Sequence, residues 1–182
     1  MSFQDFLLNF DSLEVCNLIT SFIFNEDNDI EESKNWFLKM IDGSWIAKVN
    51  AGGCRNYRET FHLNPKFVLD FKKPDKAGGK CSVIIALLQK NRRRYGLKHL
   101  SIGFLIFDLY GYDTASNFDE EFFNTNTSIA RSHSYVNMRG NSRRFKFPPG
   151  KYLIIPSTFE PDEEGDFLLR VISECSCNLY KL

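Results

Sequence analysis

From Trp36 onward the chain alternates short apolar runs with short turn segments, and this texture limits the fold more than any other feature. The runs have the length of strands, and the segments between them contain Gly, Pro, Asn or Ser, which favour turns. No interior stretch shows a convincing helical period. With 182 residues and 43% hydrophobic content, the chain can build one such domain. We therefore predict an all-β fold, an antiparallel β-sandwich of about eight strands.

Three runs can be placed within that fold. Asp42-Gly43 is the strongest short hairpin signal in the chain, because Asp-Gly suits a two-residue turn. We expect Trp36 and Trp45 to lie on the two arms of this hairpin and to pack into or against the sandwich. The runs "CSVIIALL" and "GFLIFDL" are almost continuously apolar, so we expect central strands there.

The predicted sandwich covers residues 36–176, and other segments flank it. Residues 1–24 have an apolar spacing that is partly helical and partly extended, which fits a short helix leading into a strand. Residues 25–35 contain "NEDNDIEES", with five acidic residues in nine, and should form an exposed linker loop. Residues 177–182 are expected to be a C-terminal tail.

The string "AGGCRNYRETFH" contains a cysteine, an asparagine and a histidine, which are the residue types of a papain-like active site. A catalytic cysteine needs a helix N-terminus or an imidazolium to lower its pKa, and no helix is predicted after Cys54. The preceding Gly52 and Gly53 fit a tight bend or bulge between strands. His62 lies in a short apolar run, where packing explains it equally well. We expect no catalytic residue in this chain.

Charge and cysteine content exclude several classes of function. Lys plus Arg and Asp plus Glu each number 23, so no net field favours nucleic acid, and we expect no nucleic-acid partner. No apolar run approaches the roughly 20 residues that cross a bilayer. The cysteines are odd in number and scattered, which favours reduced thiols in a cytoplasmic protein. They are Cys16, Cys54, Cys81, Cys175 and Cys177.

The acidic loop "EPDEEGD" is the best local candidate for a calcium site, because it offers five carboxylates around a glycine that permits a bend. The alternative is a solvated hairpin turn. The candidate ligands are Glu160, Asp162, Glu163, Glu164 and Asp166. We expect no other cofactor.

The strings "QKNRRR" and "NSRRFK" are basic segments of the chain that could bind an anionic partner. Such cations can attract anionic phospholipid, or can form bidentate pairs with carboxylates of an acidic protein surface. An exposed turn without a specific partner is the third alternative. The candidate docking residues are Lys90, Arg92, Arg93, Arg94, Arg143 and Arg144.

Several long strings carry a family resemblance. "WIAKVNAGGCRNYRETFHLNPKFVLDF", "VIIALLQKNRRR", "LSIGFLIFDL" and "RRFKFPPGKYLIIPSTFEPDEEGDFLLRVISE" resemble the β-sandwich domain of calpains, domain III of the large subunit. "MSFQDFLLNFDSLEVCNL" resembles the segment in which a calpain protease core ends. The resemblance covers the chain from Met1 to about Glu174.

The resemblance implies what the chain does and what it lacks. The catalytic Cys, His and Asn of the family lie in the protease core, so a structural role is implied for Cys54. We also expect structural roles for Trp36, Trp45, Gly52, Gly53, Pro149 and Gly150.

The implied function is that of a non-catalytic regulatory module of a calcium-dependent cysteine endopeptidase. It would couple the protease core, in the same polypeptide or in trans, to calcium and membrane signals. The alternative is a stand-alone adaptor or phospholipid-binding domain with no attached protease. We expect a cytoplasmic protein, with membrane association as an open alternative.

One loop departs from the family pattern. In many calpains the loop after the "NPKF" string is strongly acidic and contacts basic residues of the protease core. Here "KKPDKAGGK" (residues 72–80) has four lysines against one aspartate. It cannot be the same anionic latch, and it would repel a calcium ion.

Overall fold

The structure, a computed structural model, describes residues 2–10, 36–72 and 79–182. The chain divides into two units, Met1–Ser33 and Lys34–Leu182. In the first unit, helix α1 (Phe3–Asn9) begins with a capping box, in which Ser2 Oγ accepts from the amide of Asp5 and the Asp5 carboxylate accepts from the amide of Ser2. The rest of the predicted lead and the acidic linker lie outside the described residues.

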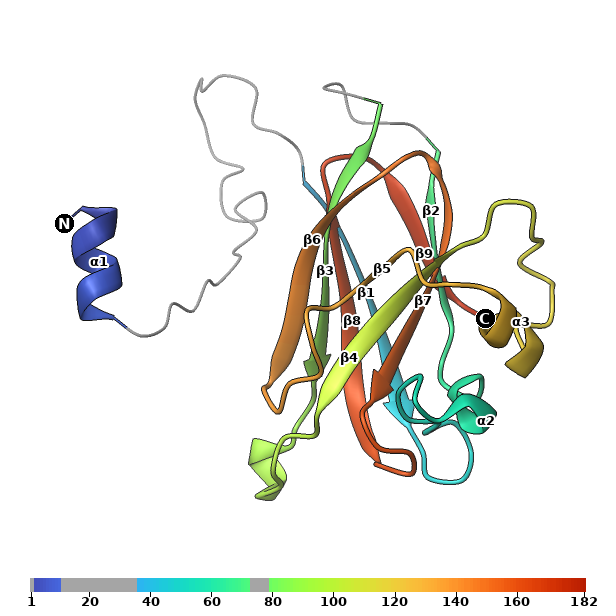
Figure 1. Cartoon of the computed structure of the whole chain (residues 1–182), viewed down its shortest axis with the longest axis horizontal. Coiled ribbons are helices and arrows are strands. Elements are labelled where there is room, and N and C mark those ends of the chain that lie inside the picture. The colour runs from blue at the N-terminus through green and yellow to red at the C-terminus, as the bar shows by residue number, and fades with distance from the viewer. Residues whose placement is uncertain (1, 11–35, 73–78) are drawn as a thin grey trace, which may run out of the picture. The chain divides into compact units, whose positions relative to one another are not determined.

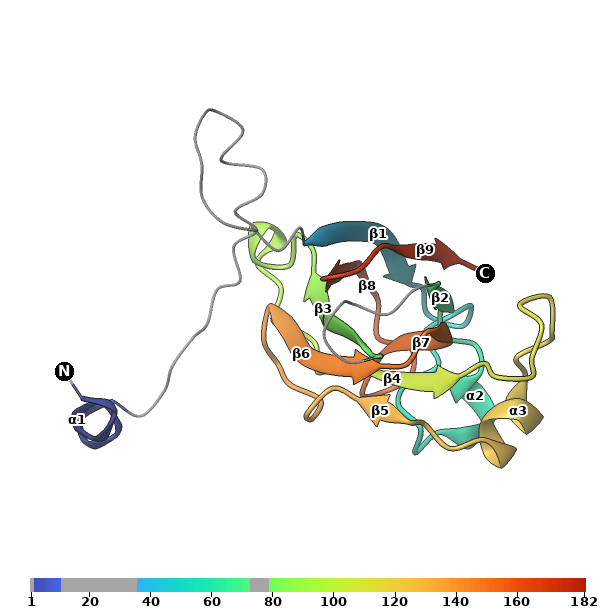
Figure 2. The same cartoon turned by 90° about the horizontal axis from the view of Figure 1, so that it is seen from above.

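The second unit consists of two antiparallel sheets that face each other (Figures 1 and 2). The four-stranded sheet has the order β1 (Phe37–Trp45), β8 (Gly165–Ser173), β3 (Cys81–Gln89) and β6 (Gly140–Phe147). The five-stranded sheet has the order β5 (Ala130–Arg131), β4 (Ile102–Asp108), β7 (Gly150–Thr158), β2 (Phe67–Phe71) and β9 (Cys177–Lys181). The predicted antiparallel sandwich is confirmed, and β3 and β4 are interior strands as expected.

Two apolar cores hold this unit together. The first lies between the sheets and includes Trp45, Phe167 and Ile106. The second lies on the outer face of the five-stranded sheet, where α2 (Arg58–Phe61) and α3 (Glu120–Thr125) pack phenylalanines against β4 and β7. Figure 2 shows both helices on that side of the sheet.

The prediction of no interior helix was therefore wrong. These helices of four and six residues are too short to show a helical period. Because β4 is covered on both faces, its residues are apolar at almost every position.

The predicted hairpin at Asp42-Gly43 is also wrong. β1 runs straight through this dipeptide and pairs with β8, with Gly43 opposite Phe167. A Cβ atom on Gly43 would lie 2.3 Å from Cζ of Phe167. Glycine stands here because an aromatic ring from the next strand occupies the space of a side chain, not because the chain turns.

One further segment differs from expectation. The expected tail from residue 177 is instead strand β9, which pairs along β2 and places Cys177 in the core and Leu179 against it. No helix among the described residues is long and apolar enough to span a membrane.

Candidate functional site at one end of the sandwich

Three loops meet at one end of the sandwich, which we call the loop end (Figure 1). They are residues 46–57 after β1, residues 90–101 between β3 and β4, and residues 159–164 between β7 and β8. The middle loop contains a short 3-10 turn, η2 (Arg93–Tyr95). Nη1 of Arg92 donates to the carbonyl of Glu164 at 2.9 Å, which ties two of these loops together.

The acidic loop holds its neighbour through carboxylates. Oδ1 of Asp162 accepts from the amide of Lys48 at 2.7 Å, and Oε1 of Glu164 accepts from the amide of Ala47 at 3.2 Å. The carboxylate of Glu160 accepts from the hydroxyl of Tyr57. These carboxylates brace the loop after β1 instead of pointing at a common centre.

No group of three or more His, Cys, Asp or Glu side chains that could hold a metal occurs in the described part of the chain. The calcium site at "EPDEEGD" therefore stays a prediction from sequence.

Glu163 has a different environment from its neighbours. Its Oε2 atom is buried and has no hydrogen-bond partner among the described residues. Burial raises the pKa of this carboxyl group above its usual range, against a backbone hydrogen bond at Glu160 that lowers it; the charge of Glu160 raises the pKa further and that of Arg92 lowers it. Ionisation of Glu163 therefore lowers the free energy of unfolding of the domain.

The β3–β4 loop is basic, and its cations fall into two kinds. Nζ of Lys90 pairs with Oδ1 of Asp42 at 2.9 Å. Arg92 donates from Nε to the carbonyl of Lys98 at 2.5 Å, in addition to its bond to Glu164. The side chains of Arg93 and Arg94 are exposed and make no hydrogen bond or ion pair within the described ranges. Together with the exposed Lys98, they are the cations of this loop that can meet a partner.

The structure does not bring Arg143 and Arg144 to the loop end. Both lie within β6, opposite Ile85 and Ile84 of β3. Arg143 donates to the carbonyl of Arg131 at 3.0 Å, and so bridges the two sheets.

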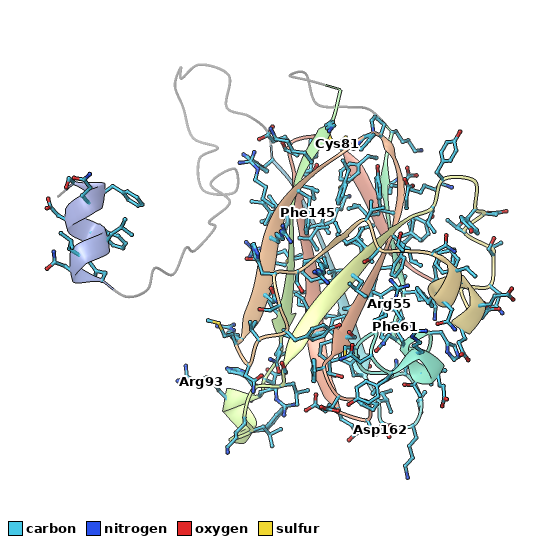
Figure 3. The ribbon with its side chains drawn as sticks, viewed as in Figure 1. Arg55, Phe61, Cys81, Arg93, Phe145 and Asp162 are labelled. Atoms are coloured by element: carbon cyan, nitrogen blue, oxygen red, sulfur yellow. The ribbon has the colours of Figure 1, made fainter. Side chains whose placement is uncertain are left out.

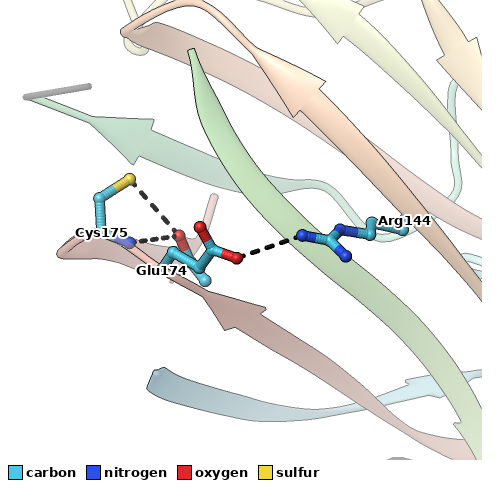
Figure 4. A network of polar contacts seen from close by, with 4 residues as sticks. Arg144, Glu174 and Cys175 are labelled. Carbon is cyan, nitrogen blue, oxygen red and sulfur yellow. Dashed lines mark hydrogen bonds and ion pairs between the residues drawn. The ribbon is translucent and has the colours of Figure 1, made fainter. Parts of the chain in front are cut away.

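Arg144 pairs with Glu174 at 3.1 Å, as Figure 4 shows, and its guanidinium lies 5.8 Å from the centre of the Trp36 ring. In the same network the amide of Cys175 donates to Oγ of Ser173 at 3.2 Å. These two arginines serve contacts inside the domain.

The segment that contains Gly53 and Cys54 has a structural role. Cys54 is 3% exposed and its amide donates to the carbonyl of Phe159. Gly53 has φ +73°, and a Cβ atom there would lie 2.7 Å from the amide nitrogen of Pro161. No hydrogen bond joins the Cys54 thiol to His62 in the described structure. The segment packs loops together and does not have the geometry of a nucleophile and its base.

The residues after Cys54 and those at the β6–β7 turn also serve the fold. Nη2 of Arg55 donates to the carbonyls of Phe123 and Asn126, both at 2.7 Å, and so fixes the C-terminal end of α3. Pro149 lies in the turn from β6 to β7, and Gly150 begins β7.

Sequence reasoning missed the exposed apolar side chains of the loop end. Ile46, Tyr95 and Leu97 are 45%, 66% and 51% exposed. They line a surface pocket of about 330 Å³ together with the buried Trp45. The signal was present in "RRRYGL", where a tyrosine and a leucine flank a glycine in a turn rather than continuing a strand.

Comparisons with known proteins identify the relatives of this chain. The family model described as calpain large subunit, domain III, matches residues 41–172. Calpain-B of Drosophila melanogaster is 45% identical over 98% of this chain, which spans 20% of that protein. The calpain-1 catalytic subunit of Bos taurus is 41% identical over 100% of this chain, which spans 27% of that protein.

A solved structure, the pre-peptidase C-terminal domain of collagenase from Bacillus anthracis, is a distant likeness. It has a TM-score of 0.42 and 14% identity, over 73% of this chain and 87% of the other.

Proposed function

Because this chain belongs to the calpain family, as domain III of the large subunit, we propose that it is a regulatory module of a calcium-dependent cysteine endopeptidase. Domain III is a non-catalytic domain of these cysteine proteases. The chain spans about a fifth to a quarter of the length of the relatives it matches, and the protease core that it would regulate is part of this proposal. The module would act by contact, and the loop end offers the surface for that contact.

Arg93 and Arg94 are the observation that supports this proposal. Two adjacent guanidinium groups are exposed in η2 and have no counter-ion in the described part of the chain. Arginine binds carboxylates through two parallel hydrogen bonds, and such pairs fix orientation as well as contributing free energy. We therefore propose an acidic face of the protease core as the partner of these two residues.

The test uses a calpain polypeptide that carries this domain. The double variant Arg93→Gln/Arg94→Gln is expected to shift the calcium concentration that gives half-maximal peptidase activity, because it removes an ionic contact between domain and core. Arg131→Gln/Lys151→Gln removes two exposed cations elsewhere and is the matched control. If both variants leave the calcium response of the parent unchanged, docking through η2 is wrong.

An anionic membrane is a second candidate partner, because Tyr95 and Leu97 are exposed on the same loop as the two arginines. Basic residues near an anionic leaflet contribute about 1 kcal/mol each, and adjacent apolar side chains can enter the interface. Sedimentation with phosphatidylserine vesicles, with calcium and with chelator at two salt concentrations, tests this role. Binding without calcium that falls with salt supports the arginines, whereas binding only with calcium supports the predicted site at residues 160–166. No sedimentation under any condition contradicts the membrane role.

A further inference from the structure

Another pocket lies beside the two short helices, and we call it the lysine pocket. Three segments line most of it: the chain between α2 and β2, the chain that leads into α3, and the end of β9. Phe61 of α2 and Phe123 of α3 pack edge to face with ring centres 5.1 Å apart, and Figure 3 shows Phe61 on this side of the sandwich. The pocket has a volume of about 370 Å³, within the range of about 300–1,000 Å³ that is usual for small-molecule sites. Among its lining residues are Leu63, Pro65, Lys66, Ser116, Asn117 and Lys181.

The walls of the lysine pocket are fixed by hydrogen bonds of the fold. Asn64, which is 1% exposed, lines the pocket, and its Nδ2 donates to the carbonyls of Gly53 and Phe61 at 2.8 and 2.9 Å. The amide of Leu182 donates to the carbonyl of Lys66 at 3.1 Å, which joins the end of β9 to the segment before β2. A pocket whose walls are fixed in advance has less ordering cost to overcome on binding.

The lining contains two ammonium groups and no carboxylate side chain. The side chain of Lys181 is exposed and makes no hydrogen bond or ion pair with the part of the chain that the structure describes. Nζ of Lys66 donates to the carbonyls of His62 and Asn64, so one of its three hydrogens stays available. Burial lowers the pKa of Lys66, because its ammonium group is incompletely solvated. An anion in the pocket would compensate both charges.

The acids that flank the segment before α3 have partners of their own. Oδ1 of Asp113 accepts from the amide of Ala115 at 3.2 Å. Oδ1 of Asp119 accepts from the amide of Phe122 at 3.1 Å and so caps the N-terminus of α3. Neither aspartate lines the pocket. The two lysines therefore meet no carboxylate side chain across the lining.

Neutral donors and an apolar wall complete the lining. The hydroxyl of Ser116 makes no hydrogen bond to a described residue, and Nδ2 of Asn117 keeps one hydrogen free beside its 3.3 Å bond to Asp119. Leu63 and the buried Pro65 supply apolar surface. A phosphate monoester has three terminal oxygens, nearly two negative charges at pH 7 and an organic group, whereas a carboxylate has two oxygens and one charge. The ester is therefore the better match to two ammonium groups, two neutral donors and an apolar wall.

We propose that the lysine pocket binds a phosphate monoester. Lys66 and Lys181 pair with the phosphate oxygens, and Ser116 and Asn117 donate to the same group. The organic part of the ester lies against the apolar wall. This site is separate from η2, so it stands or falls independently of docking through the two arginines.

A titration of the whole chain, followed through backbone amide shifts by NMR, tests the proposal. Glycerol 3-phosphate should give saturable shifts at Lys66, Ser116 and Lys181, with a Kd that is roughly millimolar for so small a ligand. Inorganic phosphate should bind more weakly because it lacks the organic group. Acetate should bind at least about tenfold more weakly than the ester, and glycerol should give no shifts at these positions. A constant ionic strength keeps screening equal in all four titrations.

Variants locate the binding. Lys181→Gln should raise the Kd for glycerol 3-phosphate at least about fivefold, because it removes a charged donor at an exposed position. Lys151→Gln removes an exposed lysine from β7 of the same sheet and should leave the Kd unchanged. The pKa of Lys66, followed through its Cε chemical shift, should rise when the pocket is saturated. Absence of saturable shifts, equal binding of acetate or inorganic phosphate, or an unchanged Kd in Lys181→Gln would overturn the inference.

Two further arms define the ligand. A C-terminal amide at Leu182 removes the terminal carboxylate as a competing anion, so this form should bind the ester at least as tightly, and weaker binding would contradict the proposal. Vesicles that contain phosphatidic acid present the same group as a lipid headgroup. Sedimentation that Lys181→Gln reduces assigns the ester to a lipid, whereas binding of glycerol 3-phosphate without such sedimentation assigns it to a soluble molecule.

Discussion

Trp45 is the largest side chain that the described part of the sandwich buries completely, and it connects the two sheets. Its Nε1 donates to the carbonyl of Pro156 at 3.2 Å, and its ring centre lies 4.4 Å from that of Phe167. Replacing Trp45 by Ala removes both contacts and leaves a cavity. We expect a loss of about 3–5 kcal/mol in the free energy of unfolding, measured by urea titration.

Trp36 provides the comparison for that prediction. It is only half-buried, and its ring packs under the guanidinium of Arg144. Trp36→Ala should cost about 1 kcal/mol or less, because an exposed cation–π contact contributes about 0.5–1 kcal/mol. Equal costs for the two replacements would mean that Trp45 is not the anchor that its burial indicates.

Glu163 should make stability depend on pH. Because the pKa of its carboxyl group is raised in the folded protein, the folded state holds the proton more tightly than the unfolded state does. Stability from this group is full below the ordinary Glu pKa, and is lost as pH rises through the raised value. Glu163→Gln should therefore stabilise the domain at pH 7 and have little effect at pH 4. Urea midpoints at both pH values check this, with exposed Glu59→Gln as the control for removing a charge.

At the scale of elements, a substitution at Gly43 tests why β1 continues through Asp42-Gly43 without a turn. Gly43→Ala would place a Cβ atom 2.3 Å from the Phe167 ring, so the ring or the strand must shift. We expect a loss of about 1–3 kcal/mol, the usual cost of overpacking a core. Gly140→Ala in β6 is the matched control, because its nearest contact would be an ordinary 3.5 Å and its effect should stay within about 0.5 kcal/mol. A tolerated Gly43→Ala would contradict the tight approach of the two strands.

For the whole molecule, we expect no peptidase activity on casein, with or without calcium. The domain to which the chain belongs is non-catalytic in calpains, and Cys54 is buried in a loop junction. Cys54→Ser should leave any trace activity unchanged. Calcium-dependent cleavage that this substitution abolishes would overturn the structural assignment of Cys54.

Much of the architecture was predictable because the spacing of apolar residues and the residue types that favour turns are local properties of the sequence. Alternating apolar runs and Gly- or Pro-containing turns predicted the sandwich, and continuous apolar character predicted that β3 and β4 are interior strands. The strings around "AGGCRN" and "PPGKYLIIP" were specific enough to predict the family, which the comparisons confirm.

Side-chain contacts between distant segments were decided by the tertiary structure alone. Asp42-Gly43 is a turn signal by local chemistry, but Phe167, more than a hundred residues later, needs the space above Gly43 and keeps β1 straight. The carboxylates of residues 160–166 are predicted calcium ligands from sequence, and the fold adds that two of them accept amides of the loop after β1. Six basic residues were predicted from the sequence to form one docking set. The fold separates Arg143 and Arg144 from the four in the β3–β4 loop, because Arg143 and Arg144 lie in the middle of strand β6. A sequence records which charges exist, whereas the burial and partners of each charge depend on what the fold brings beside it.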